Sequence, residues 1–207
     1  FPEDYTKEKK YPLIIVLDAD YLFDNVVANA KFYSTFHGMP QAIIAGVHQS
    51  KNQLRLEDAA FDESTGLPSE KAKLFFEFLG MELIPYLETS YNTAPFKMIV
   101  GYDITANFAN YYLFKEESLF NSYVVISPTL APEMETRVPA RLSAMQKTIF
   151  YHLITDGELS KNDNQIPVLN TALKAIDKEN LRYFYDNYTN ADHISVATYG
   201  IGKAFNL

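Results

Sequence analysis

The sequence has 207 residues, a mass of 23.6 kDa and 47% hydrophobic side chains, which is enough to bury one sizeable core. Its 26 acidic and 18 basic residues give a formal net charge of -8, which disfavours nucleic acid as a partner because phosphate backbones require a basic surface. The absence of cysteine excludes disulfides, cysteine-ligated metals and thiol catalysis. No apolar run approaches the length of a membrane span. We therefore expect a single domain over residues 1–207.

Short apolar runs alternate along the chain with stretches that have helical spacing. The runs lie at 13–17, 42–47, 97–101, 123–127 and 149–155, with a weaker aromatic run at 182–188. The helical stretches lie at 25–36, 69–91, 104–115, 164–177 and 194–205. Continuous apolar runs are typical of strands covered on both faces, and intervening helices are what parallel strands require. The sequence predicts an α/β protein, a three-layer αβα sandwich around a mostly parallel sheet.

One predicted helix carries its own start and break signals. Ser69 follows Pro68 and is expected to cap the helix over 69–91. Gly80 and Pro85 lie inside that stretch and are expected to kink it.

Residues 97–109 predict a strand that turns abruptly into a helix. This is the setting of the G-x-S-x-G turn, in which the central residue has a strained backbone and its neighbours must be small. Gly101 and Ala106 satisfy the size requirement, whereas Thr105 is larger than glycine. Asp103 stands where the serine nucleophile would be.

Five segments resemble the "Putative esterase" family of α/β-hydrolases, which includes enterochelin-esterase-like and feruloyl-esterase-like enzymes. The segment YPLIIVLDADYLF (11–23) is similar to the family opening YPVIYVLDGD-x-x-F. Residues 52–58 match N-x-x-R-x-x-D, and residues 82–88 resemble ELIPYIE. Residues 119–128 resemble LF-x-x-YIAISPS, and Asp192-His193 resembles a late DH pair.

The resemblance implies a fold, an activity and a set of site residues. The fold would be an α/β-hydrolase fold lacking its N-terminal strand or strands, and the activity would be ester hydrolysis on a small molecule without a cofactor or metal. Asp103 would occupy the nucleophile position, His193 the base position, and Glu158 or Asp156 the acid position. Backbone N–H groups of Ile104 and of Ala19, or a neighbour of Ala19, would bind the oxyanion. Tyr21, Tyr102 and Arg55 would bind substrate, and the family habit points to an exported protein.

Two departures from the family pattern change the expected chemistry. Asp103 has no hydroxyl proton to give to a base, and Ala19 stands where the family prefers glycine. We expect Asp103 and His193 to form an ion pair, and we expect ester hydrolysis to be strongly impaired. Two alternatives stay open. Asp103 could attack a saturated carbon, as in dehalogenase-like or epoxide-hydrolase-like relatives, or the domain could be a non-catalytic structural or partner-binding module.

Several residues also have ordinary structural interpretations. His193 could simply cap the helix that follows, and the acidic residues of the 155–158 turn could be solvated. Arg55 could pair with Asp58 on a surface loop. His37, His48 and His152 do not have metal-ligand spacing.

Overall fold

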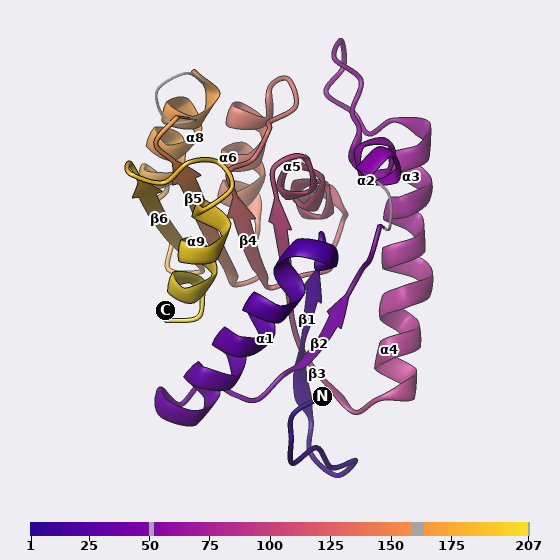
Figure 1. Cartoon of the computed structure of the whole chain (residues 1–207). Coiled ribbons are helices and arrows are strands. Elements are labelled where there is room, and N and C mark those ends of the chain that lie inside the picture. The colour runs from indigo at the N-terminus through magenta and orange to yellow at the C-terminus, as the bar shows by residue number, and fades with distance from the viewer. Residues whose placement is uncertain (50–51, 159–163, 207) are drawn as a thin grey trace.

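The computed structural model describes residues 1–49, 52–158 and 164–206. Within these ranges one sheet has six strands, all parallel, in the order β2-β1-β3-β4-β5-β6. Because the strands are parallel, their carboxyl ends meet at one end of the sheet (Figure 1). The strands are β1 (Tyr11–Val16), β2 (Ile43–Gly46), β3 (Thr93–Tyr102), β4 (Ser122–Ile126), β5 (Ile149–Asp156) and β6 (Leu181–Tyr188).

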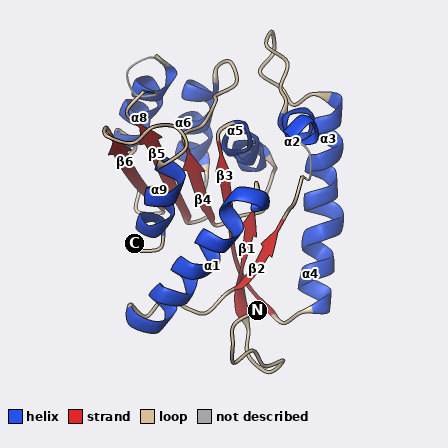
Figure 2. Cartoon of the chain, in the orientation of Figure 1, coloured by secondary structure: helices blue, strands red, loops and turns tan. Residues whose placement is uncertain are grey.

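Helices cover both faces of the sheet (Figure 2). On one face α1 (Ala19–Phe36) and α9 (Val196–Ala204) pack over a cluster that includes Ile14 and Val16 of β1. On the other face the cluster includes Leu13 and Ile15 of the same strand. This alternation along β1 confirms the predicted three-layer sandwich. The helices on this second side are α3 (Glu70–Glu77), α4 (Ile84–Ser90), α5 (Ile104–Asn110), α6 (Met134–Ala144) and α8 (Gln165–Lys174).

The helices differ from the sequence expectation chiefly at α1, at the predicted helix over 104–115, and in two helices that were not predicted. α1 begins at Ala19, directly after β1, rather than at residue 25. The predicted helix over 104–115 is α-helical only to Asn110 and continues as a 3₁₀ turn over Tyr111–Phe114. α2 (Asn52–Ala59) and α6 were not predicted. α2 is rich in polar residues, and α6 contains Pro139, which is unusual inside a helix.

The helix expected over 69–91 changes geometry in its middle. The Ser69 hydroxyl accepts a hydrogen bond from the Ala72 N–H at 3.2 Å, which confirms the predicted cap. Between α3 and α4 lies a π-helical segment over Phe78–Leu83, in which the Ile84 N–H bonds to Leu79 O five residues earlier. Pro85 cannot donate a backbone hydrogen bond, and the change to π geometry precedes it directly.

None of the helices in the described ranges is long and apolar enough to cross a membrane.

Candidate active site

The turn at Asp103 joins the central strand β3 directly to α5. β3 ends at Tyr102 and α5 begins at Ile104, which leaves Asp103 alone between them with φ 57° and ψ -125°. Non-glycine residues rarely adopt this conformation, and it marks a strained turn. A Cβ atom at Gly101 would lie 2.7 Å from Thr105 O and 2.9 Å from the Ala106 Cα. The strand and helix can therefore approach this closely only with glycine at position 101.

Both carboxylate oxygens of Asp103 are held by neighbouring side chains. Oδ2 accepts a hydrogen bond from Arg55 Nη1 at 3.2 Å, and Oδ1 accepts one from Thr129 Oγ1 at 2.6 Å. Arg55 comes from α2, and Thr129 follows the carboxyl end of β4. The Asp103 side chain is 24% exposed, so the carboxylate lies at the surface of the site rather than deep within it.

Arg55 also anchors a second, buried carboxylate. Its Nε donates to Asp18 Oδ1 at 2.5 Å and its Nη2 donates to Asp18 Oδ2 at 3.3 Å, which is a bidentate pair. The Asp18 side chain is completely buried, and this burial raises its pKa, although the pairing with Arg55 acts in the opposite direction. Thr105 donates its hydroxyl to the same carboxylate. Asp58, the other partner considered for Arg55, instead accepts a hydrogen bond from Gln49.

His193 lies on the loop between β6 and α9, with one ring nitrogen facing each of two carboxylates. Its Nδ1 is 3.1 Å from Asp156 Oδ2, and its Nε2 is 3.9 Å from Asp103 Oδ1. Asp156 ends β5 and is buried, and its other oxygen accepts the Glu158 N–H at 2.9 Å. The Glu158 side chain is exposed. Of the two acids considered for the imidazole, the structure brings Asp156 to His193.

Tyr102 fixes the backbone of the loop that carries His193. Its hydroxyl donates to His193 O at 2.6 Å, and the two ring centroids lie 4.9 Å apart. Burial raises the pKa of Tyr102 to about 12, with a further contribution from the charge of Asp103. The hydroxyl therefore stays protonated at neutral pH and remains a hydrogen-bond donor.

A cavity of about 570 Å³ lies between the starts of α1 and α9 and helix α2. Asp103 is not among its lining residues, but Arg55, which pairs with Asp103, is one of them. Its volume lies within the usual range for small-molecule sites. Tyr21, Tyr102 and Arg55, the three residues predicted to bind substrate, all line it. The other lining residues are mostly apolar: Leu22, Asn25, Leu56, Ile194, Ala197 and Thr198.

The two backbone groups expected to bind an oxyanion differ in their surroundings. The Ile104 N–H is at the first position of α5, where a helix leaves its N–H groups without intrahelical partners. The Ala19 N–H donates to Val47 O at 3.2 Å, so it is already engaged. Sequence reasoning did not single out Thr129. Its only signal was its position in the loop after a predicted strand.

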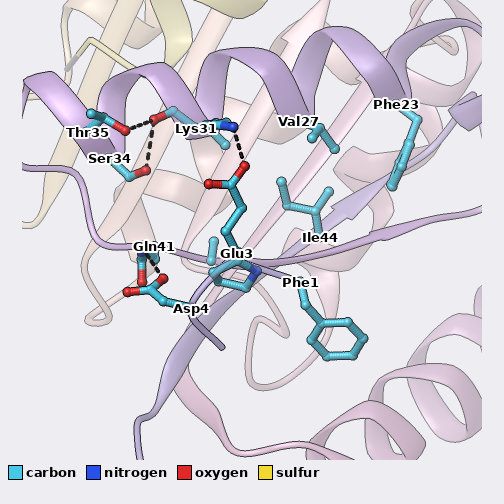
Figure 3. A pocket seen from close by; sticks show the side chains of 13 residues that line it. Phe1, Glu3, Asp4, Phe23, Val27, Lys31, Ser34, Thr35, Gln41 and Ile44 are labelled. Carbon is cyan, nitrogen blue, oxygen red and sulfur yellow. Dashed lines mark hydrogen bonds and ion pairs between the residues drawn. The ribbon is translucent and has the colours of Figure 1, made fainter. Parts of the chain in front are cut away.

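A second cavity, of about 520 Å³, lies against the other end of α1 (Figure 3). There Lys31 pairs with Glu3, and Gln41 donates to Asp4 (Figure 3). Its lining includes none of the predicted site residues among those that the structure describes. Within the same described ranges, no cluster of three or more His, Cys, Asp and Glu side chains could hold a metal ion.

Comparison with known proteins relates this arrangement to a family. The "Putative esterase" model matches residues 1–195. An uncharacterised protein from Capnocytophaga ochracea DSM 7271 is 29% identical to this chain, and the two structures superpose with a TM-score of 0.89. The match covers 99% of this chain and 57% of the Capnocytophaga chain. The chain thus spans little more than half of that relative. No curated protein gives a significant match.

Two further structures are similar in fold. The BES protein from Bacillus cereus is 21% identical with a TM-score of 0.82, and the match covers 99% of this chain and 85% of that one. An IroE-like serine hydrolase from Shewanella oneidensis is 20% identical with a TM-score of 0.79, covering 96% and 70% of the two chains. The family match over most of the sequence and the shared architecture lead to one conclusion: this chain belongs to the Putative esterase family and has the α/β-hydrolase fold.

Proposed function

We propose that this domain is an esterase-family member that binds a small ester-like molecule but is strongly impaired in hydrolysing it. The proposal rests on one observation, which is the residue type and the pairing of Asp103. The residue at the strained turn is a carboxylate whose two oxygens are held by Arg55 and Thr129. It is a paired anion at the position where a serine hydrolase needs a proton-bearing nucleophile.

Leaving-group chemistry supports the loss of ester hydrolysis. If the Asp103 carboxylate attacked an ester carbonyl, the tetrahedral intermediate could expel either that carboxylate or the alkoxide of the substrate. A carboxylic acid has a pKa of about 4 and an alcohol one of about 16, so the gap of about 12 units corresponds to about 16 kcal/mol. The carboxylate leaves, and the reaction reverses.

Electrostatics act in the same direction. An ester hydrolase stabilises the negative oxygen of the intermediate with donors aimed at it. If water attacks the ester instead, the Asp103 carboxylate keeps its negative charge beside the Ile104 N–H, where that oxygen would form. The charge raises the energy of the intermediate relative to the bound ester.

The cavity supports ligand binding over a purely scaffolding role. A module that had lost its ligand would be expected to fill this space with side chains, whereas about 570 Å³ is open here. Arg55 and two tyrosines provide polar groups on a wall that also has the apolar side chains of Leu22, Leu56, Ile194 and Ala197.

The decisive experiment restores a hydroxyl at the turn. We expect Asp103→Ser to hydrolyse short p-nitrophenyl esters with kcat/KM at least about a hundredfold above the unaltered chain. Asp103→Asn is the matched control, because it removes the same charge without supplying a nucleophile, and we expect it to stay inactive. Adding His193→Ala to the serine variant should abolish the gain. Substantial turnover by the unaltered chain would contradict the proposal.

A second candidate function is hydrolysis at a saturated carbon through a covalent intermediate on Asp103. It rests on the position of His193, whose two ring nitrogens face Asp103 and Asp156. In this reaction an Asp103 oxygen forms a bond to a saturated carbon while the leaving group departs with its electron pair. His193 then takes a proton from water as the water attacks the carbonyl carbon of the resulting ester, the bond between that carbon and the alkoxy oxygen breaks, the alcohol leaves with the proton, and the Asp103 carboxylate is restored. The variant His193→Gln would trap the alkylated enzyme. Incubation with haloalkanes and epoxides, followed by peptide mass spectrometry, would reveal an adduct on Asp103 and so replace the impaired-esterase proposal with this one.

A further inference from the structure

The last strand of the sheet, β6, has an open outer edge. It is outermost on the side opposite β2 (Figure 2), and within the described residues no strand pairs with its outer side. β6 has eight residues without proline or lysine, and its register with β5 is unbroken from Leu181 to Tyr188. β2, at the other edge, has only four residues. Proteins usually shorten, bend or cover an edge as long and regular as that of β6, because its backbone groups can pair with another strand.

The backbone groups of alternate residues point to this open side. The Ile149 N–H of β5 donates to Asn180 O at 2.9 Å. Because backbone direction alternates along a strand, the even-numbered residues of β6 bond to β5, and the N–H and C=O groups of Tyr183 and Tyr185 point outward. Among the described residues, none bonds to these outward groups. They are therefore available to a further strand.

Three side chains of β6 on the face that carries α9 have a symmetric pattern of charge. Arg182, Phe184 and Asp186 alternate along the strand, so they lie on one face. Arg182 is exposed and forms no ion pair with the residues that the structure describes. Asp186 accepts a hydrogen bond from His152 through Oδ2 at 2.7 Å, and its side chain is 28% exposed. Burial lowers the pKa of His152, so this partner is neutral at pH 7 and leaves the charge and the second oxygen of Asp186 available.

We propose that β6 pairs antiparallel with β6 of a second copy of this chain, about a two-fold axis at Phe184, so that the two sheets join into one. Tyr183 and the partner's Tyr185 then exchange backbone hydrogen bonds, and the axis repeats this exchange. Arg182 lies two residues before Phe184 and Asp186 lies two after it. Each Arg182 therefore faces the partner's Asp186 directly across the two strands. Opposite charges and aromatic side chains at facing positions both stabilise paired strands.

The charges select this axis over the neighbouring ones. An axis at Arg182 would place two arginines opposite each other, and an axis at Asp186 would place two aspartates there, and like charges at facing positions repel. An axis at Tyr183 or Tyr185 would leave Arg182 opposite an aromatic residue. The inference does not depend on the proposed function, because none of these residues belongs to the site around Asp103.

Sedimentation equilibrium from low to high micromolar concentration tests the proposal. We expect a concentration-dependent species of twice the chain mass of 23.6 kDa. Arg182→Glu should raise the dissociation constant at least about tenfold, because it replaces attraction to the partner's Asp186 with repulsion at both symmetric positions. Lys10→Glu is the matched control, since it makes the same charge change at an exposed residue before β1 and should leave association unchanged. Thermal unfolding of each variant verifies that it is folded.

A second substitution tests whether these two residues face each other. Adding Asp186→Asn to Arg182→Glu should recover part of the lost affinity, because it removes the repulsion while the amide oxygen can still accept from His152. A monomer at every concentration overturns the proposal, as does a dimer that Arg182→Glu leaves intact. A double variant no tighter than Arg182→Glu alone overturns the facing charge pair.

A cysteine at the axis tests the register directly. The chain contains no cysteine, so a single introduced cysteine can form a disulfide only with another copy. Phe184→Cys would place two thiols at facing positions, at a separation that a disulfide can span, and we expect a covalent dimer under mild oxidation. Asn187→Cys is the control, because it is exposed on the same strand but three residues from the axis. No cross-link at position 184, or an equally efficient one at position 187, overturns the register.

Discussion

Arg55 joins three parts of the chain, because it pairs with Asp18 after β1 and with Asp103 after β3 while belonging to α2. Its removal would leave a buried carboxylate without its cation. We expect Arg55→Met to lower the free energy of unfolding by about 3 kcal/mol, measured by urea denaturation. Lys31→Met, which removes the exposed pair with Glu3, should cost under about 1 kcal/mol. Equal effects from the two substitutions would show that the Arg55 network is not stabilising.

His152 provides a pH-dependent contribution to stability. It is buried on β5, its Nε2 lies 2.7 Å from Asp186 Oδ2, and its Nδ1 has no partner among the described residues. Burial lowers the pKa of His152 below the usual 6.5, despite the neighbouring Asp186. The unfolded chain therefore binds the proton more readily than the folded chain does. This contribution is fully present above pH 6.5 and is lost as the pH falls toward the folded pKa.

The matching measurement follows the free energy of unfolding between neutral and mildly acidic pH. We expect a shallower pH dependence in His152→Gln, which cannot be protonated, than in the unaltered chain. Each group of this kind contributes at most about 1.4 kcal/mol per pH unit. Parallel curves for the two proteins would contradict this account of His152.

At the scale of elements, the junction of β3 and α5 depends on Gly101. An added Cβ would meet backbone atoms of α5 that cannot move aside, so strand and helix would have to separate. We expect Gly101→Ala to destabilise the fold by about 2 kcal/mol or more in urea unfolding. Gly80→Ala is the control, because the closest atom there is 3.6 Å away on the Tyr112 side chain. A neutral result at position 101 would mean that the turn relaxes easily.

At the scale of the molecule, the site is assembled from segments far apart in the sequence. The carboxyl ends of the parallel strands lie at one end of the sheet, which brings Asp18, Asp103 and Asp156 together. Arg55 of α2 and His193 of the β6–α9 loop reach these carboxylates at the same end. If residues 1–207 form one domain, as composition predicts, unfolding should be a single transition. We expect far-ultraviolet circular dichroism and the near-ultraviolet signal of the 15 tyrosines to change together in urea. Separate midpoints would reveal two independent units.

The strands, their parallel direction and the turn at Asp103 could be predicted because their signals are local. β-branched runs, a cap such as Ser69 and a small residue such as Gly101 each act within a few positions of themselves. α2 and α6 were missed for the same reason. Their helical state depends on packing against the rest of the fold, which composition does not record.

The sequence by itself determined the layer architecture, the family resemblance and the presence of a carboxylate at the turn, since each depends on residue type and short-range spacing. Only the tertiary structure decided that Asp156 rather than Glu158 meets His193, that Arg55 holds Asp18 and Asp103 together, and that Thr129 binds the same carboxylate. Hydrogen bonds and ion pairs require distances of a few ångströms between side chains. Those distances are set by how the strands pair and the loops close, and residues dozens of positions apart carry no local mark of that arrangement.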